Sequence, residues 1–223
     1  MYAFSGGIRA ALPIAIAYLP VAFALGAAAS RLGFSVVESV LWSLTMFSGA
    51  NQALMLSAIS SGVSLVILTL LSIAASLRHA LYGIALSGRI EARPATRATF
   101  AYGLTDEVFA TVLSAADRHD RPLAGSWLVG LAMTVLAVWV IGTGLGNAAG
   151  DVLQALSPAI SEALDFALPA LFLALVLATL SRKNAARMAV AALIAAAIAA
   201  LGRPELAIPA GAVAAFIPVR GEV

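Results

Sequence analysis

The chain is dominated by apolar runs that are long enough to cross a lipid bilayer, and these runs leave few folds open to it. A spanning helix needs about 20 predominantly apolar residues, and the ranges 8–30, 36–60, 64–87 and 126–145 reach that length. Hydrophobic residues form 62% of the 223 residues and charged residues 11%, whereas a soluble domain is about half apolar and about a quarter charged. We therefore expect an all-α polytopic membrane protein with one transmembrane domain over 1–223.

The composition excludes several function classes. A formal charge of +2 without a basic patch gives no sign of nucleic-acid binding. The absence of cysteine rules out a disulfide, a thiolate nucleophile and a cysteine metal site, and we expect neither a metal nor a cofactor. No phosphate-binding glycine loop occurs, so we do not expect ATP to drive this chain directly. The first 30 residues are expected to stay as a membrane segment, because their apolar run is too long for a signal peptide.

Prolines and short apolar segments predict broken helices. Pro13 and Pro20 lie in the first apolar run, and proline removes a hydrogen-bond donor and breaks or bends a helix. Pro169 interrupts one of the late segments, and such segments are typical of the broken helices of transporters. These late segments are 166–180, 185–201 and 206–219. We predict about seven transmembrane helices, seven or eight, with broken or re-entrant segments. The tripeptides Ala11-Leu12-Pro13 and Ala167-Leu168-Pro169 suggest an internal inverted repeat.

Two charged clusters interrupt the apolar sequence. The first, at 76–83, contains Arg78 and His79, and the second, at 103–110, contains Asp106 and Glu107. A charge at bilayer depth costs a few kcal/mol or more, so it persists only where it is paired or faces a polar cavity. These clusters are therefore the candidate working part of the protein.

Four short motifs follow one another along the chain. They are Phe47-Ser48-Gly49-Ala50-Asn51-Gln52, Arg78-His79-Ala80-Leu81-Tyr82-Gly83, Leu104-Thr105-Asp106-Glu107-Val108-Phe109-Ala110 and Leu164-Asp165-Phe166-Ala167-Leu168-Pro169-Ala170-Leu171-Phe172. Together they resemble the AzlC family of bacterial amino-acid exporters. The sequence departs from that family at Asn51, where a small Ser or Ala usually precedes the glutamine. The resemblance implies a multi-pass transporter of the bacterial inner membrane that exports branched-chain or similar small apolar amino acids. It also implies a small hydrophobic membrane partner, AzlD.

The acidic cluster has two interpretations. Thr105 can cap a helix whose first turn contains Asp106 and Glu107, just after a break at Gly103. The cap can simply start a helix at the membrane surface. Alternatively, the helix end lines a transport path, where a carboxylate takes up a proton or binds an amine. Neighbouring helix positions lie about 100° apart, so Asp106 and Glu107 cannot both face one cavity. One is expected to be the working group and the other a partner for arginine or solvent.

The basic cluster also has two interpretations. Arg78 and Tyr82 are four residues apart and share a helix face, with His79 beside them. Arg78 can extend to the inner membrane interface, with Tyr82 in the aromatic belt. Alternatively, Arg78 pairs with Asp106 or Glu107, and a substrate carboxylate or a proton breaks the pair. His79 titrates near neutrality and can serve a proton relay.

Neutral polar residues mark the remaining positions. Asn51 and Gln52 follow a break at Gly49, and their amides can bond another helix or contact the substrate. Asp165 is expected to cap the short helix that begins at 166. The glycines at 142, 146 and 150 have the four-residue spacing that lets two helices approach closely, although a flexible loop would also use such glycines. We expect them to contact another helix.

Basic loops indicate the orientation, because cytoplasmic loops carry an excess of Arg and Lys. The basic range 181–187 is expected inside and the acidic range 147–165 outside. One clean span then places 117–122 inside, and three arginines place 88–97 inside as well. Both placements hold only if the segment 98–116 enters the membrane and returns. The competing topology makes this segment a full span, which gives eight spans and leaves three arginines outside.

Three function classes remain to be compared. The first is a secondary exporter of small amino acids, coupled to the proton gradient, and the expected ligands are a small amino acid and the lipid bilayer. The second is an intramembrane hydrolase using Ser48 and His79, but no nucleophile motif supports it, and we do not expect an enzyme. The third is a non-catalytic subunit or channel whose polar residues only connect helices. Saturable, substrate-specific transport separates the first class from the third.

Overall fold

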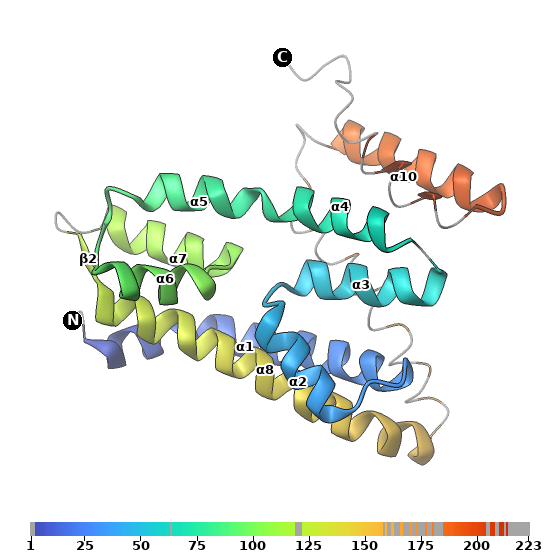
Figure 1. Ribbon diagram of the computed structural model, residues 1–223, viewed down its shortest axis with the longest axis horizontal. Helices are drawn as coiled ribbons and strands as arrows, with labels where there is room; N and C mark the ends of the chain where they lie inside the picture. Colours follow the sequence, from blue (N-terminus) through green and yellow to red (C-terminus); the bar gives the residue numbers. More distant parts are fainter. Residues whose placement is uncertain are drawn as a thin grey trace.

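The computed structural model of the chain is almost entirely helical (Figure 1). It describes residues 3–62, 64–118, 122–157 and 185–203, together with isolated positions within 159–180 and 206–213. The helices are α1 (Phe4–Arg31), α2 (Val36–Thr45), α3 (Gly49–Ser61), α4 (Leu65–Ser76), α5 (Arg78–Leu86), α6 (Pro94–Tyr102), α7 (Asp106–Asp117), α8 (Gly125–Leu156) and α10 (Ala185–Ala200). Two short strands, β1 (Ile90–Glu91) and β2 (Leu123–Ala124), pair in parallel.

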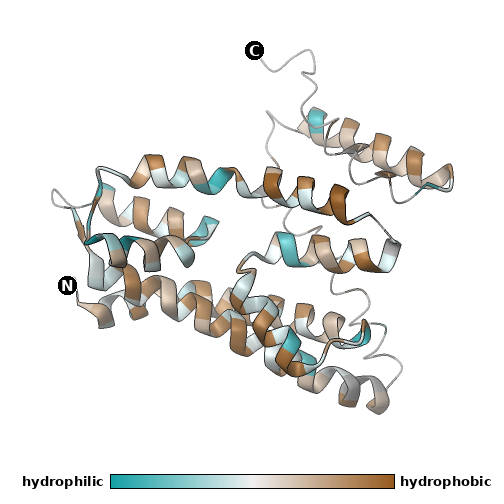
Figure 2. Cartoon of the chain, viewed as in Figure 1, coloured by the Kyte–Doolittle hydropathy of each residue, from teal (hydrophilic) through white to brown (hydrophobic). Residues whose placement is uncertain are grey.

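Three helical stretches among the described residues are long and apolar enough to cross a membrane. They are Phe4–Arg31, Leu65–Leu86 and Gly125–Gly150, and the second combines α4 and α5. Hydrophobic residues cover the outer faces of these helices (Figure 2), as contact with lipid requires. The prediction of a mostly helical chain with apolar spans is confirmed, whereas the expected number of about seven spans is not. Asp165, Pro169 and most of the segments 166–180 and 206–219 lie outside the described residues.

Helices α1 and α8 share the most extensive contact and run parallel to each other. Gly7 near the start of α1 lies against Trp127, and Gly26 near its end lies against Thr143. The glycines remove side chains from the contact, so the two backbones touch. The predicted contact of the three spaced glycines with another helix is confirmed, and the partner is α1. Gly142 meets Ala22, Gly146 meets the carbonyl of Phe23, and Gly150 meets Ser30.

The prolines of α1 do not interrupt it. The sequence predicts helix breaks at Pro13 and Pro20, but α1 is continuous from Phe4 to Arg31 and contains both. A proline removes one backbone donor and bends a helix, but a helix can continue when the flanking turns are held by packing. Buried Ala11, Ile14 and Ala22 provide that packing on either side of the prolines.

Two segments of the chain are each broken into two short helices. Helices α2 and α3 are separated by Met46–Ser48, and α6 and α7 by Gly103–Thr105. In each pair a hydroxyl caps the second helix: Ser48 accepts from the Asn51 N–H, and Thr105 accepts from the Val108 N–H. None of the four helices exceeds 13 residues, so none is long enough to cross a bilayer by itself. The predicted breaks at Gly49 and Gly103 therefore adjoin real helix ends.

The two broken pairs form hairpins that enter from opposite ends of the structure (Figure 1). The α6–α7 hairpin starts and finishes at one end, because β1 pairs with β2 and the Leu123 N–H donates to the Arg89 carbonyl at 3.1 Å. Arg89 also forms an ion pair with Asp117. The α2–α3 hairpin starts and finishes at the other end. The described residues of the loops 88–97 and 117–122 thus lie together, as the re-entrant topology requires.

Each hairpin packs on a different half of the α1–α8 pair. The α6–α7 hairpin buries Phe100, Val108 and Val112 with the first half of α8, including Leu128 and Leu131. A second group of buried side chains joins the α2–α3 hairpin to the later turns of α1 and to Trp139 of α8. It includes Ala22, Leu25, Trp42, Ala53 and Leu56. Each hairpin therefore has its own hydrophobic cluster, and Tyr18 and Phe47 pack against both clusters.

The hairpin tips meet near the middle of α8. Gly103 packs against Ala132, and Gly49 packs against the ring of Trp139. These two α8 positions are seven residues apart, or about 10 Å along the helix. Both lie near the centre of the apolar span Gly125–Gly150. The two helix breaks therefore sit near the middle of the bilayer when α8 crosses it.

The hairpin topology can be tested with single cysteines, since the natural chain has none. Gly88→Cys and Arg118→Cys flank the α6–α7 hairpin, and Ser60→Cys lies at the opposite end. We expect a membrane-impermeant thiol reagent to label the first two from the same side of the membrane and Ser60→Cys from the other. Labelling of Gly88→Cys and Arg118→Cys from opposite sides would make α6–α7 a full span.

The α1–α8 contact can be tested with a matched pair of glycines. A Cβ at Gly146 meets the backbone of Phe23, whereas a Cβ at Gly83 of α5 meets open space. We expect Gly146→Ala to lower stability by about 1–3 kcal/mol through overpacking, seen as a lower melting temperature in detergent. Gly83→Ala should be neutral or stabilising, because alanine favours the helix. Equal melting temperatures for the two variants would contradict the close contact.

Candidate functional site

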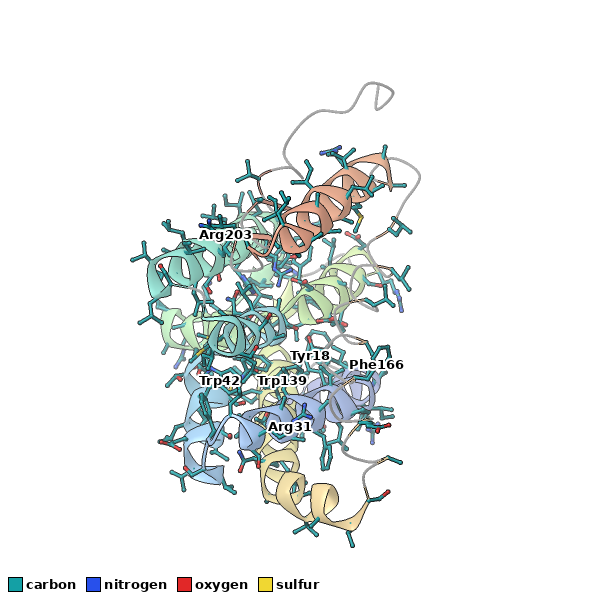
Figure 3. The ribbon with its side chains drawn as sticks, turned by 90° about the vertical axis from the view of Figure 1, so that its right-hand side faces the viewer. Tyr18, Arg31, Trp42, Trp139, Phe166 and Arg203 are labelled. Carbon is teal, nitrogen blue, oxygen red and sulfur yellow. The ribbon has the colours of Figure 1, made fainter. Side chains whose placement is uncertain are left out.

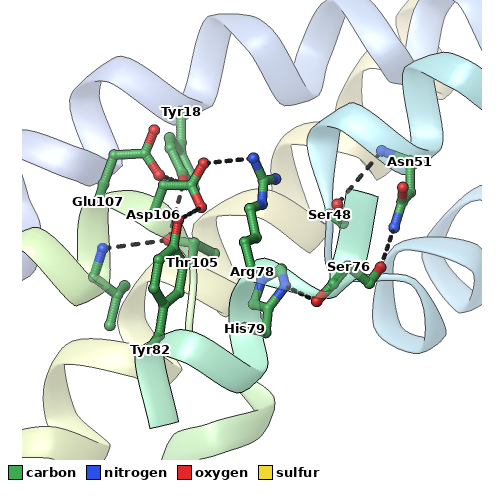
Figure 4. A network of polar contacts seen from close by, with 11 residues as sticks. Tyr18, Ser48, Asn51, Ser76, Arg78, His79, Tyr82, Thr105, Asp106 and Glu107 are labelled. Atoms are coloured by element: carbon green, nitrogen blue, oxygen red, sulfur yellow. Dashed lines mark hydrogen bonds and ion pairs between the residues drawn. The ribbon is translucent and has the colours of Figure 1, made fainter. Parts of the chain in front are cut away.

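Polar side chains from several helices gather at the hairpin tips, and we call this group the central cluster (Figure 4). Its members lie on α1, on the loop and first turn of α3, on the junction of α4 and α5, and on the loop and first turn of α7. They are Tyr18, Ser48, Asn51, Ser76, Arg78, His79, Tyr82, Thr105, Asp106 and Glu107. The cluster contains seven of the eight residues that the sequence predicts for a substrate or proton pathway; Gln52 is the exception.

Asp106 is held by two donors from α5. Its Oδ2 lies 2.9 Å from Nη1 of Arg78, and its Oδ1 accepts from the Tyr82 hydroxyl at 2.8 Å. Arg78 and Tyr82 reach the same carboxylate because they are four residues apart on one helix face. The Tyr82 ring also stacks on Phe109 of α7, with ring centroids 4.2 Å apart. Of the two pairings open from sequence, the structure shows Arg78 with Asp106.

Glu107 has a different partner on a different helix. The Tyr18 hydroxyl of α1 contacts Glu107 Oε2 and also lies 3.0 Å from the hydroxyl of Thr105. Thr105 in turn accepts from the Val108 N–H and so caps α7. The neighbouring carboxylates of Asp106 and Glu107 therefore point to separate sets of donors, as their 100° separation on the helix requires.

The sequence does not predict the roles of Tyr18 and Ser76 in the cluster. The Tyr18 ring packs edge-on against Trp139, with centroids 5.0 Å apart, so it is fixed by the α1–α8 contact (Figure 3). A buried tyrosine hydroxyl normally finds a hydrogen-bond partner. A tyrosine inside the otherwise apolar run 8–30 is therefore the signal that could have pointed to it.

A second arm of the cluster joins α3 to the α4–α5 junction. The Asn51 amide donates to the Ser76 hydroxyl at 3.0 Å, and His79 Nδ1 lies 3.1 Å from the Ser76 carbonyl. Ser48 stays engaged as the cap of α3. Ser48 and His79 thus bond to different groups, and their described contacts do not form a nucleophile–base pair.

Two buried polar atoms of the cluster have no hydrogen-bond partner among the described residues. They are the Asn51 Oδ1 acceptor and the Arg78 Nε donor. Asn51 is only 8% exposed, so its unpaired oxygen carries a desolvation cost. An unpaired acceptor and an unpaired donor in one cluster are complementary to a ligand that carries one donor and one acceptor.

Gln52 lies outside the cluster, in a buried network between helices. Its Nε2 donates to Ser43 at 2.9 Å, and its Oε1 accepts from the Trp139 Nε1 at 2.7 Å. Ser43 also donates to Thr143 at 2.9 Å, so the network connects α2, α3 and α8. Gln52 is 0% exposed. Of the two interpretations open from sequence, the structure therefore supports helix–helix bonding for Gln52 and not substrate contact.

The chemistry of the cluster suits binding of a small charged molecule. One guanidinium pairs with the carboxylate of Asp106, and a second carboxylate, hydroxyl groups and an amide lie around this pair. Among the described residues, no three His, Cys, Asp or Glu side chains are grouped as a metal site would need. The cluster can therefore bind groups of both charge signs and exchange protons.

The Gln52 network generates a stability prediction. Gln52→Leu leaves the buried Trp139 N–H unpaired, which should cost about 1–3 kcal/mol and lower the melting temperature in detergent. The Gln52→Leu/Trp139→Phe double variant lacks that N–H. Its loss of stability should therefore be smaller than the sum of the losses in Gln52→Leu and Trp139→Phe. Strict additivity, or an unchanged melting temperature for Gln52→Leu, would contradict the structural interpretation.

Comparison with known proteins finds related membrane proteins. Residues 13–153 match the family described as AzlC protein. Inner membrane protein YgaZ of Escherichia coli (strain K12) is 41% identical over 152 residues, which are 67% of this chain and 62% of that protein. An uncharacterized membrane protein of Archaeoglobus fulgidus is 38% identical over 150 residues, 67% of this chain and 64% of the relative. The match thus spans less than two thirds of either relative. No solved structure is significantly similar.

Proposed function

Because the chain belongs to the AzlC family, we propose that it is an inner-membrane secondary transporter that exports branched-chain or similar small apolar amino acids. The observation that carries the proposal is the 2.9 Å ion pair between Arg78 and Asp106 at the hairpin tips. The tips lie beside the centre of the α8 span. Charges at that depth are costly, and they mark transport pathways in membrane proteins.

The central cluster complements the two charges of an amino acid. The carboxylate of a bound amino acid can accept from Arg78, whose Nε has no partner among the described residues. Its ammonium can donate to Asp106 and to Asn51, whose Oδ1 also has none. Such a ligand satisfies both orphan atoms and competes with the Arg78–Asp106 pair, so its arrival and departure can open and re-form that pair. The aromatic rings of Phe47 and Phe109 at the tips offer apolar contact to an aliphatic side chain.

The helix pattern supports secondary transport. Two full spans, α1 and α4–α5, are each followed by a broken hairpin, and the two hairpins enter from opposite ends. Discontinuous helices that meet near the membrane midplane, arranged in inverted repeats, are typical of secondary transporters. In this arrangement, movement of one hairpin against the α1–α8 pair opens the central cluster to one side of the membrane and closes it to the other.

Proton coupling and a partner subunit complete the proposal. Two carboxylates beside one arginine leave one acidic group free to exchange a proton during the cycle. Family membership is the basis for proposing a small AzlD-type membrane subunit as the partner. The transported amino acid moves across the bilayer as a zwitterion.

The proposal is tested by transport in proteoliposomes, with and without the partner subunit. The wild-type protein should move labelled leucine, isoleucine, valine or methionine in a saturable manner. Arg78→Ala should lower the initial rate by about tenfold or more, because it leaves Asp106 without its counter-charge at the depth of the hairpin tips. Arg89→Ala removes an ion pair with Asp117 at the end of the structure where the α6–α7 hairpin begins and finishes, and should change the rate by less than about twofold.

Two results would contradict this function. Equal rates for Arg78→Ala and Arg89→Ala would show that the central ion pair does not serve transport. Amino-acid flux that never saturates, or that fails to discriminate among solutes, would instead favour a channel or a non-catalytic subunit with structural polar residues.

A further inference from the structure

We propose that Glu107 is the carboxylate that carries the proton, that Tyr18 switches its hydrogen bond with the protonation of Glu107, and that Asp106 stays ionised as the partner of Arg78. This assignment rests on the proposed transport function. It gives different roles, proton carrier and ion-pair partner, to two neighbouring acids that the sequence does not distinguish.

Asp106 is the less suitable proton carrier. Both of its oxygens are occupied, one by the Arg78 guanidinium at 2.9 Å and one by the Tyr82 hydroxyl at 2.8 Å. A nearby cation and hydrogen bonds donated to a carboxylate both favour its ionised form. Protonation of Asp106 would leave Arg78 without its counter-charge inside the membrane. Asp106 therefore remains charged while Arg78 is its partner.

Glu107 lacks such a cation in its described contacts. Its hydrogen-bond partner is the neutral Tyr18 hydroxyl, from α1. The other charged or titratable groups of the cluster are Asp106 on its own helix and, from α5, Arg78, His79 and Tyr82. Arg78 and Tyr82 are bound to Asp106, and His79 is bound to the Ser76 carbonyl. The second negative charge is therefore the one that a proton can neutralise at lowest cost.

Accessibility points to the same residue. Glu107 is exposed on the surface of the chain, whereas Asp106 is half-buried. An exposed, ionised carboxylate at the depth of the hairpin tips must face water or another polar group and not lipid. A proton can therefore reach Glu107 without breaking the Arg78–Asp106 pair.

Tyr18 links the charge of Glu107 to the start of α7. Its single O–H has two acceptors within reach, Glu107 Oε2 and the Thr105 hydroxyl oxygen at 3.0 Å. A hydroxyl donates one hydrogen bond at a time. When Glu107 is ionised, Tyr18 donates to it. When Glu107 takes up a proton, its carboxyl O–H donates to the Tyr18 oxygen, and Tyr18 donates to Thr105.

The switch moves one proton and leaves the covalent bonds of Tyr18 intact. One proton binds Glu107 Oε2, the charge of that group changes from −1 to 0, and Tyr18 keeps its own proton. Thr105 caps α7 and stands directly before Asp106 in the chain. A change in its hydrogen bonding therefore reaches the helix end that holds the partner of Arg78. Tyr18 and Thr105 are thus positioning residues between the proton site and the ion pair.

The test compares two transport measurements on the wild-type protein and its variants in proteoliposomes, with the partner subunit if export requires it. The first is exchange of labelled for unlabelled leucine without a pH gradient. The second is net leucine movement driven by an imposed pH gradient. In Glu107→Gln the rate of gradient-driven leucine movement should fall by about tenfold or more, and the rate of leucine exchange should no longer vary with pH. In Asp106→Asn the rate of leucine exchange should also fall by about tenfold or more, because Arg78 loses its counter-charge.

Two further variants complete the comparison. Tyr18→Phe should keep a pH-dependent exchange but shift its midpoint, because the proton site loses its hydrogen-bond donor. Glu91→Gln, an exposed acid of β1, is the matched control and should behave as wild type. An infrared difference spectrum between acidic and neutral pH should show the band of a protonated carboxyl in wild type and Asp106→Asn, and should lose it in Glu107→Gln.

The outcomes separate this assignment from the function on which it rests. Gradient-driven transport that survives in Glu107→Gln, or a carboxyl band that disappears in Asp106→Asn instead, overturns the assignment while transport stands. Wild-type protein that exchanges none of the small apolar amino acids overturns the proposed function. In that case the infrared spectra still decide whether Glu107 or Asp106 is the group that takes up the proton.

Discussion

The close parallel contact between α1 and α8 is the constraint on which the rest of the structure depends. Glycines on both helices let the backbones touch, with Gly26 beside Thr143 and Gly146 beside Phe23. No other helix pair among the described residues shares so much contact. Each hairpin attaches to this pair mainly through its own hydrophobic cluster, and Phe47 at the α2–α3 tip packs against both clusters. A closely packed pair with two hairpins held mainly by different clusters is a scaffold in which one hairpin can move while the rest keeps its shape.

This scaffold also sets the depth of the polar residues. The packing of Gly103 on Ala132 and of Gly49 on Trp139 brings both helix breaks to neighbouring turns of α8. Tyr18 of α1 and Arg78 of α5 then reach the start of α7 from two sides. The electrostatic arrangement is thus a product of apolar packing, since each charged side chain is placed by a helix whose position the hydrophobic clusters determine.

Much of this arrangement could be predicted from the sequence because charges are so costly in a membrane. The pairing of Arg78 with an acid follows from that cost, and the helix breaks lie beside the predicted positions Gly49 and Gly103, with Thr105 as the predicted cap of α7. Other features depend on tertiary contacts that no local pattern contains. The choice of Asp106 over Glu107, the burial of Gln52 away from the cluster and the place of Tyr18 are decided by neighbouring helices. Local rules also overestimate the effect of proline in α1, because packing on α8 compensates for it.

The opposed hairpins have an electrical consequence. Helices α3 and α7 both begin at the centre and run toward opposite ends, so their macrodipoles point in opposite directions. Helices α2 and α6 end at the centre, and their dipoles oppose each other in the same way. Along the membrane normal these contributions cancel, so the transmembrane voltage exerts little net force on the hairpin backbones. At the centre they do not cancel: each tip presents a partly negative helix end next to a partly positive one. The backbone itself therefore offers a pair of opposite partial charges at each hairpin tip, whichever end of the structure that hairpin enters from.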